Sequence, residues 1–237
     1  MELRIVPDEA ALAQQAADIF AETLAAKPTA HFCLPAGRSP RPLYAELVNR
    51  AAAGALDFTQ ARFTQLDEWF GLANDDPATC RADLWTHLAE PLGLDDEQWL
   101  GFDSATPDPL AECARVAEAL AAWGNIDLCL LGLGLNGHLG LNEPAGWLSG
   151  GPHLAQLSAA TRGHNMLSGL AEPPSHGMTL GLADLLRAER VLLVVTGADK
   201  REALDRAVNG KPTSKFPASL LQWHRDCLVL ADAAAGG

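Results

Sequence analysis

The chain has 237 residues, of which 48% are hydrophobic and 20% charged, so it is long enough for one substantial globular domain with a sizeable core. Its formal net charge of −13 disfavours nucleic acid and anionic membrane surfaces as partners, because the average field repels both. No stretch approaches the roughly 20 consecutive apolar residues of a membrane helix, and the N-terminus lacks the apolar run of a signal peptide, so we expect a cytoplasmic protein.

Short apolar runs alternate with longer stretches of helical periodicity, which is typical of βα units and a mostly parallel sheet. In chain order the pattern predicts a helix over 9–26 capped by Asp8, a strand over 30–34, a helix over 41–53, a strand over 62–66, helices over 79–88 and 109–123, strands over 126–131 and 190–195, a helix over 200–208 and a strand over 227–230. We therefore predict one α/β domain over 1–237, with a Rossmann-like, doubly wound sheet and helices on both faces. The alanine-rich end, 233–237, is expected to fray.

The cysteines give no sign of a metal site or a disulfide framework. There are five, an odd number, and none has CxxC or other metal-ligand spacing; they are Cys33, Cys80, Cys113, Cys129 and Cys227. We expect them to be reduced thiols.

Ligands of open parallel sheets bind beyond the carboxyl ends of the strands, so the residues after each predicted strand are candidates for a site. In one such turn Gly37, Arg38 and Ser39 precede a helix, and free N–H groups there would favour a phosphate. An ordinary strand-to-helix turn is the alternative. Lys200 lies near a predicted helix start, where a cation is unfavourable unless an anion binds too, so it is either a phosphate ligand or a solvated surface lysine.

Two other strand ends carry groups that could transfer protons. The loop 132–144, GLGLNGHLGLNEP, holds Asn136, His138 and Glu143, and the carboxylate could tune the imidazole for proton transfer near neutral pH. A lone histidine is more often structural, but the surrounding glycines favour a functional one. Asp67 follows another predicted strand and could remove a proton from carbon next to a carbonyl, or simply cap a helix.

Three motifs together resemble those of the glucosamine-6-phosphate deaminase and 6-phosphogluconolactonase superfamily. They are LDEWFGL at 66–72, GLGLNGHLGLNEP at 132–144 and TGADKREAL at 196–204. The second motif, the strand containing Cys129 and the segment 216–219 look most like the bacterial galactosamine-6-phosphate deaminase/isomerase branch. The resemblance implies a sugar phosphate as the small-molecule partner, conversion of galactosamine 6-phosphate to tagatose 6-phosphate and ammonia, and no metal or organic cofactor.

The resemblance also implies roles for the candidate residues. Asp67 would move a proton between C2 and C1 of the opened sugar, His138 would shuttle a proton at the ring oxygen, and Glu143 would orient that histidine. The implied phosphate site consists of Gly37, Arg38, Ser39 and Lys200.

The chain departs from the glucosamine branch at two positions. Asn136 stands where those enzymes usually have aspartate, so a second carboxylate near the histidine is absent. A phosphate-binding arginine of that branch falls at Leu167, so Arg38 or Arg162 would have to supply the cation. Both departures shift weight toward galactosamine 6-phosphate.

Several alternatives remain. A glucosamine-6-phosphate deaminase differs only in the orientation of one substrate hydroxyl, and a 6-phosphogluconolactonase would use the histidine to activate water. A sugar-phosphate sensor and an inactive relative are further alternatives, although the chain lacks the basic helix-turn-helix segment of a transcription regulator. The sequence leaves a homo-oligomer open. Because the chain ends soon after its last predicted strand, we expect no activation by amino sugars.

Overall fold

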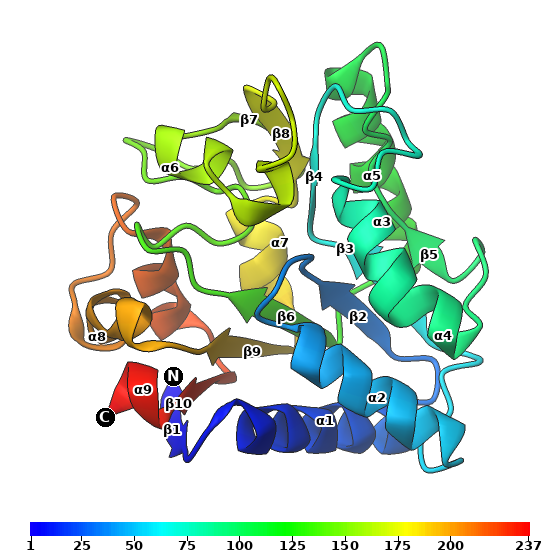
Figure 1. Cartoon of the computed structure of the whole chain (residues 1–237), viewed down its shortest axis with the longest axis vertical. Helices are drawn as coiled ribbons and strands as arrows, with labels where there is room; N and C mark the ends of the chain where they lie inside the picture. Colours follow the sequence, from blue (N-terminus) through cyan, green and yellow to red (C-terminus); the bar gives the residue numbers. More distant parts are fainter.

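The computed structural model describes residues 1–237 and contains a seven-stranded parallel sheet and a three-stranded antiparallel sheet (Figure 1). In spatial order the main sheet consists of β1 (Glu2–Val6), β10 (Cys227–Asp232), β9 (Arg190–Val195), β6 (Leu128–Gly132), β2 (His31–Leu34), β3 (Arg62–Gln65) and β5 (Trp99–Leu100). The small sheet consists of β4 (Asp67–Trp69), β8 (His176–Thr179) and β7 (His153–Gln156). Since β4 begins directly after β3, the small sheet extends from the carboxyl end of the main one.

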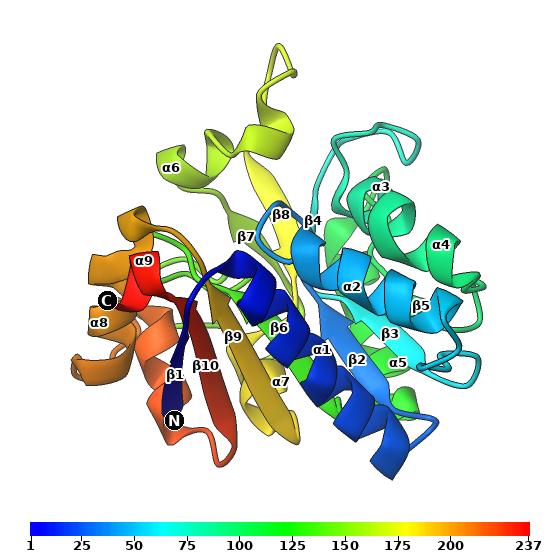
Figure 2. The ribbon, with the colours of Figure 1, turned by 60° about the horizontal axis from the view of Figure 1, so that its bottom comes forward.

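Helices cover both faces of the main sheet, as the sequence predicts (Figure 2). The helices are α1 (Glu9–Ala26), α2 (Arg41–Ala52), α3 (Cys80–Leu84), α4 (Glu90–Leu92), α5 (Pro109–Trp123), α6 (Ala159–Arg162), α7 (Leu182–Arg187), α8 (Arg201–Asn209) and α9 (Ala233–Gly236). None of them combines the length and the hydropathy that would let it span a membrane.

The central strand β6 shows why the sheet needs two helical layers. Leu128 and Leu130 pack in one cluster with side chains of α1 and α2, whereas Cys129 and Leu131 pack in another with side chains of α5, α7 and α8. Consecutive side chains of a strand point to opposite faces, so an uninterrupted apolar run buries both. The doubly wound fold class predicted from these runs is confirmed.

Short and irregular elements differ from the predictions. The edge strands β1 and β5 and the three strands of the small sheet were not predicted from the sequence. The helix predicted over 79–88 consists of α3 and a π-helical turn (Trp85–Ala89), and it continues beyond the predicted end into α4. Of the residues 233–237 that were expected to fray, Ala233–Gly236 form the short helix α9, where the Asp232 side chain accepts a hydrogen bond from the N–H of Ala235 at 2.7 Å. The five cysteines are unpaired and buried.

Candidate active site

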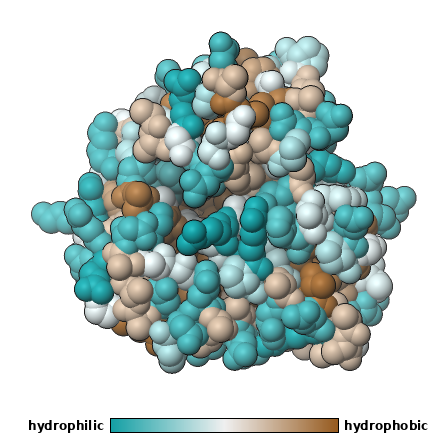
Figure 3. Space-filling view, viewed as in Figure 1, coloured by the Kyte–Doolittle hydropathy of each residue, from teal (hydrophilic) through white to brown (hydrophobic).

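The strand order of the main sheet reverses between β2 and β6. From β2 the sheet continues through β3 and β5, and from β6 it continues in the other direction through β9, β10 and β1. The loops that follow β2 and β6 therefore diverge and leave a crevice, which is where ligands of doubly wound sheets bind. A cavity of about 250 Å³ lies there, and the same face is hollowed in the space-filling view (Figure 3).

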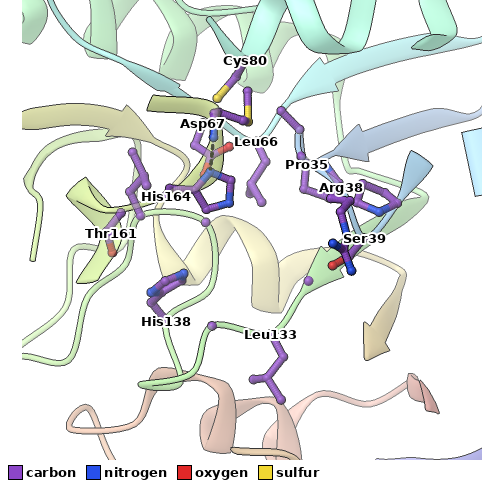
Figure 4. A pocket seen from close by; sticks show the side chains of 18 of the residues that line it. Pro35, Arg38, Ser39, Leu66, Asp67, Cys80, Leu133, His138, Thr161 and His164 are labelled. Carbon is purple, nitrogen blue, oxygen red and sulfur yellow. Dashed lines mark hydrogen bonds between the residues drawn. The ribbon is translucent and has the colours of Figure 1, made fainter. Parts of the chain in front are cut away.

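The cavity brings together candidate residues that are far apart in the sequence. Asp67 and His138 lie on different walls of it, and Arg38 and Ser39 lie to one side (Figure 4). All but one of the predicted site residues line it, namely Gly37, Arg38, Ser39, Asp67, Asn136, His138 and Lys200. The exception, Glu143, lies behind Asn136 and His138 and contacts both.

Asp67 is a carboxylate with no hydrogen-bond donor from the protein on either oxygen. Burial, with a smaller contribution from the charge of Glu68, raises the pKa of Asp67 to about 7. The neighbouring Glu68 points elsewhere and accepts hydrogen bonds from Gln65 Nε2 and from the N–H groups of Trp69, Cys80 and Arg81, all at 2.8 Å. Glu68 therefore holds the start of α3, while Asp67 is free to exchange a proton.

Glycines position His138. A β-carbon at Gly134 would lie 2.5 Å from the imidazole, so only glycine lets the ring lie against the backbone there. Gly137 has a φ of 82°, and a β-carbon on it would come within 2.5 Å of the Phe216 ring. The N–H of Ala218 also donates to the Gly137 carbonyl at 2.8 Å, so the segment 216–219 buttresses the loop that carries His138.

Glu143 is held by several donors. Its Oε2 accepts from Asn136 Nδ2 at 2.8 Å, and its Oε1 accepts from the Thr161 hydroxyl and, at 3.3 Å, from the N–H of Ser158. Burial would raise the pKa of Glu143, but the Thr161 hydroxyl, the neighbouring His138 and Asn136 together bring it below its ordinary value. Glu143 is thus a fixed negative charge.

The contact between Glu143 and His138 is electrostatic. His138 Nδ1 lies 3.8 Å from Glu143 Oε2, which exceeds hydrogen-bond length, and this nitrogen has no other partner in the protein. Burial lowers the pKa of His138, and the charge of Glu143 opposes that effect. The imidazole is therefore mainly neutral near pH 7 and can accept a proton from a bound molecule or, once charged, return it.

The turn after β2 offers donors to an anion. The N–H of Gly37 donates to the buried Asp83 at 2.8 Å, so Gly37 shapes the turn and its own N–H is already bonded. The N–H groups of Arg38 and Ser39 make no hydrogen bond to the protein. Lys200, just before α8, donates to the carbonyl of Leu133 at 2.8 Å and has further N–H groups to offer.

The two arginines considered as replacements for the arginine absent at Leu167 differ in their position relative to the cavity. Leu167 is buried in a small apolar cluster, and Arg162 is outside the cavity lining, whereas Arg38 lines it. Sequence reasoning missed Asp83, Thr161 and His164. These three are polar residues in short helices or irregular segments without a motif, and only the folded chain shows what they touch.

The crevice thus contains a carboxylate that can change protonation near pH 7, an imidazole, and a turn that favours an anion. These are the components of an enzyme that acts on a small anionic molecule. The family model described as glucosamine-6-phosphate isomerases/6-phosphogluconolactonase matches residues 7–230. The chain belongs to this family and is an enzyme.

Individual proteins that are similar to this chain support its membership of the family. The Escherichia coli (strain K12) protein "Putative deaminase AgaI" is 40% identical over 96% of this chain and 90% of its own length. The glucosamine-6-phosphate deaminase of Streptomyces coelicolor is 37% identical over 99% of this chain and 91% of its own length. The solved structure of a monomeric glucosamine-6-phosphate deaminase of the NagB superfamily superposes with a TM-score of 0.95 at 30% identity, covering 99% of this chain and 98% of the other. A 6-phosphogluconolactonase from Leishmania guyanensis, at 18% identity and a TM-score of 0.80, shares the fold.

Proposed function

We propose that this enzyme isomerises and deaminates an amino-sugar 6-phosphate, with galactosamine 6-phosphate as the preferred substrate and tagatose 6-phosphate and ammonia as products. The observation that carries the proposal is Asp67, an unbonded carboxylate whose pKa of about 7 suits proton transfer at neutral pH, in the same cavity as His138. Membership of the family and the likeness to named deaminases support the reaction class.

The first step is the opening of the sugar ring. Neutral His138 takes the proton of the C1 hydroxyl, directly or through water, and the imidazolium then donates a proton to the ring oxygen as the C1–O bond breaks. The nearby charge of Glu143 stabilises the imidazolium between these two transfers. The product is an open-chain aldehyde with an amine on C2.

The second step moves a proton from C2 to C1. The aldehyde makes the C2–H acidic, and ionised Asp67 removes that proton while the enolate oxygen on C1 takes a proton from the amine on C2, which is in its ammonium form; the product is a neutral enolamine. Protonated Asp67 then returns its proton to C1. This leaves a ketimine at C2, to which water adds, and loss of ammonia gives the ketose phosphate. The carboxylate can carry out both transfers because its pKa is close to neutral.

The phosphate supplies binding energy that holds the reacting carbons in place. The unbonded N–H groups of Arg38 and Ser39, together with Lys200, are the donors we assign to it. The proposed chemistry uses no metal or organic cofactor, because an aldehyde next to the reacting C–H already provides the acidity. We expect turnover to be unchanged by EDTA.

Preference for the galactose epimer rests on the motifs that resemble the galactosamine branch, and on Asn136 and Leu167 in place of an aspartate and an arginine. The second candidate is glucosamine 6-phosphate, which is favoured by the 37% identity to a deaminase of that name.

A single set of assays tests the proposal. The purified protein is offered galactosamine 6-phosphate, glucosamine 6-phosphate and 6-phosphogluconolactone, and release of ammonia, ketose phosphate and acid is recorded for each. We expect ammonia and ketose phosphate in equal amounts, fastest with galactosamine 6-phosphate. Faster turnover of glucosamine 6-phosphate would reverse the epimer preference, and hydrolysis of the lactone without ammonia release would replace the proposed reaction.

A further inference from the structure

One segment over the cavity carries a side chain to which the proposed chemistry assigns no part. It runs between β7 and β8 and is held at two points. Near its start, the Thr161 hydroxyl donates to Glu143; farther along, Leu167 is 1% exposed in a cluster with Trp69 and Leu141. His164 lies between these two anchors, so its position is set from both sides.

The imidazole of His164 lines the cavity (Figure 4). A β-carbon added at Gly37 would lie 3.7 Å from His164 Cε1, and the ring centre is 6.1 Å from that of Trp69. Its Nδ1 accepts a hydrogen bond from the N–H of Met166 at 3.3 Å. An accepting Nδ1 carries no proton, so in the neutral ring the proton is on Nε2, which makes no hydrogen bond to the protein.

The surroundings of His164 favour an anion. Enclosure in the cavity, followed by the charge of Lys200, lowers the pKa of His164, and Asp83 opposes the shift. Asp83 is already bonded to the Gly37 N–H and paired with Arg41. His164 and Lys200 both line the cavity, so an anion bound between them could accept a hydrogen bond from each.

We infer that His164 is a substrate-binding residue that donates its Nε2–H to the phosphate, completing the anion site formed by the N–H groups of Arg38 and Ser39 and by Lys200. The inference rests on the proposed function only in that the substrate is a phosphorylated sugar. The phosphate would then receive a hydrogen bond from the segment between β7 and β8, in addition to those from residues that follow the strands of the main sheet.

The test compares two substitutions on the same segment. His164→Ala removes the imidazole from the cavity, whereas Arg162→Ala removes a full positive charge from a side chain outside the cavity lining. Isothermal titration measures the binding of two unreactive probes, 2-amino-2-deoxygalactitol 6-phosphate and the same alditol without phosphate; kcat and KM are measured with the preferred amino-sugar phosphate.

We expect His164→Ala to weaken binding of the phosphorylated probe about 10- to 100-fold, the range for loss of a hydrogen bond to a charged group. Binding of the unphosphorylated probe should change less than about twofold, and the kinetic effect should fall on KM more than on kcat. His164→Arg, which keeps a donor and a charge, should recover most of the affinity, and Arg162→Ala should match the wild type.

Three results would overturn the inference. They are wild-type affinity of His164→Ala for the phosphorylated probe, an equal loss for both probes, and a loss in Arg162→Ala as large as in His164→Ala. If His164→Ala does not fold, His164→Phe, which fills the space of the ring without a donor, is compared with His164→Arg. Loss of phosphate affinity in His164→Phe alone would support donation by the side chain, whereas equal affinity of the two variants would contradict it. Titration with inorganic phosphate separates the two proposals: His164-dependent phosphate binding in a protein that deaminates no amino sugar would retain the site and reject the reaction.

Discussion

Asp67 on β4 lines the cavity, Glu143 in the loop after β6 lies behind the Asn136 and His138 that line it, and the protein surrounds the two carboxylates differently. Asp67 receives no hydrogen bond, and burial raises its pKa to about 7. Glu143 receives hydrogen bonds from Asn136, Thr161 and Ser158, and its pKa is lowered. Two identical functional groups therefore differ in protonation near neutral pH.

Because their pKa values differ, Asp67 and Glu143 suit different tasks in the proposed reaction. A carboxylate that titrates near pH 7 can take up a proton and return it within one catalytic cycle, whereas one with a depressed pKa remains a constant charge. The constant charge lies 3.8 Å from His138 Nδ1, where it supports the charged imidazole without binding it directly. The comparison predicts which changes stop turnover and which only move its pH dependence.

Removing the proton carrier should have the largest effect. Asp67→Asn keeps the shape of the side chain but cannot accept the C2 proton, so kcat for ammonia release should fall about 10³-fold or more. In the wild type, kcat/KM should rise with pH and reach half its plateau near the Asp67 pKa of about 7, because the ionised form is the base. Binding of the phosphorylated alditol to the variant serves as the control for an intact site. Ammonia release within tenfold of the wild-type rate would remove Asp67 as the base.

Removing the constant charge should have a smaller effect. Glu143→Gln deprives the imidazolium of its neighbouring charge, lowers the pKa of His138 further and leaves Asn136 Nδ2 facing an amide, so kcat should fall about 10- to 100-fold. Glu189→Gln, which changes a surface glutamate, is the matched control. Stopped-flow or coupled ammonia assays across pH 6 to 9 measure both. Unchanged turnover in Glu143→Gln would mean that the histidine does not depend on this charge.

The raised pKa of Asp67 also has a consequence for stability. Its folded pKa of about 7 exceeds the unfolded value of about 3.9, so its favourable contribution is complete below about pH 4 and is lost as the pH rises through 7. The amide introduced by Asp67→Asn stays neutral at every pH, so this variant should be more stable than the wild type at pH 8. A full shift of three units corresponds to about 4 kcal/mol, which partial exposure reduces to about 1 to 3 kcal/mol. Urea unfolding at pH 5 and pH 8 measures the difference, which should be larger at pH 8. An equal difference at both values would contradict the raised pKa.

The main sheet and much of the site were predictable because their signals are local. Apolar runs such as 126–131 mark buried strands, and glycine-rich segments after them mark the loops where ligands bind. Strand order then places Asp67 and His138 around one cavity.

The remaining features depend on contacts between distant segments. β4 has three residues and is a strand only because β8 pairs with it, and no local pattern marks Thr161 or His164 as neighbours of the loops after β6 and β2. Asn136 was only partly predictable. The sequence shows an asparagine where relatives of the glucosamine branch usually have a charged aspartate, but only the fold shows its contacts. Its side-chain amide donates to Glu143, and its side-chain oxygen accepts from the N–H of His138.

Restoring a carboxylate at that position gives the finest test of the comparison. In Asn136→Asp the new carboxylate would face Glu143 Oε2 at the 2.8 Å separation now spanned by a hydrogen bond, so the pair should share a proton at an elevated apparent pKa. Above that pKa the added charge raises the pKa of His138, and we expect kcat/KM at pH 8 to rise about 2- to 5-fold, since roughly half a pKa unit corresponds to a threefold change.

The double variant Asn136→Asp with Glu143→Gln separates charge from hydrogen bonding. The glutamine amide at position 143 can donate to the new aspartate, while its oxygen keeps the hydrogen bonds from Thr161 and Ser158. The site therefore retains one negative charge, which is now at position 136 instead of position 143. Its pH profile should therefore resemble that of the wild type. If the double variant is as impaired as Glu143→Gln alone, the position of the charge matters rather than its presence, and Glu143 must act through its particular geometry toward His138.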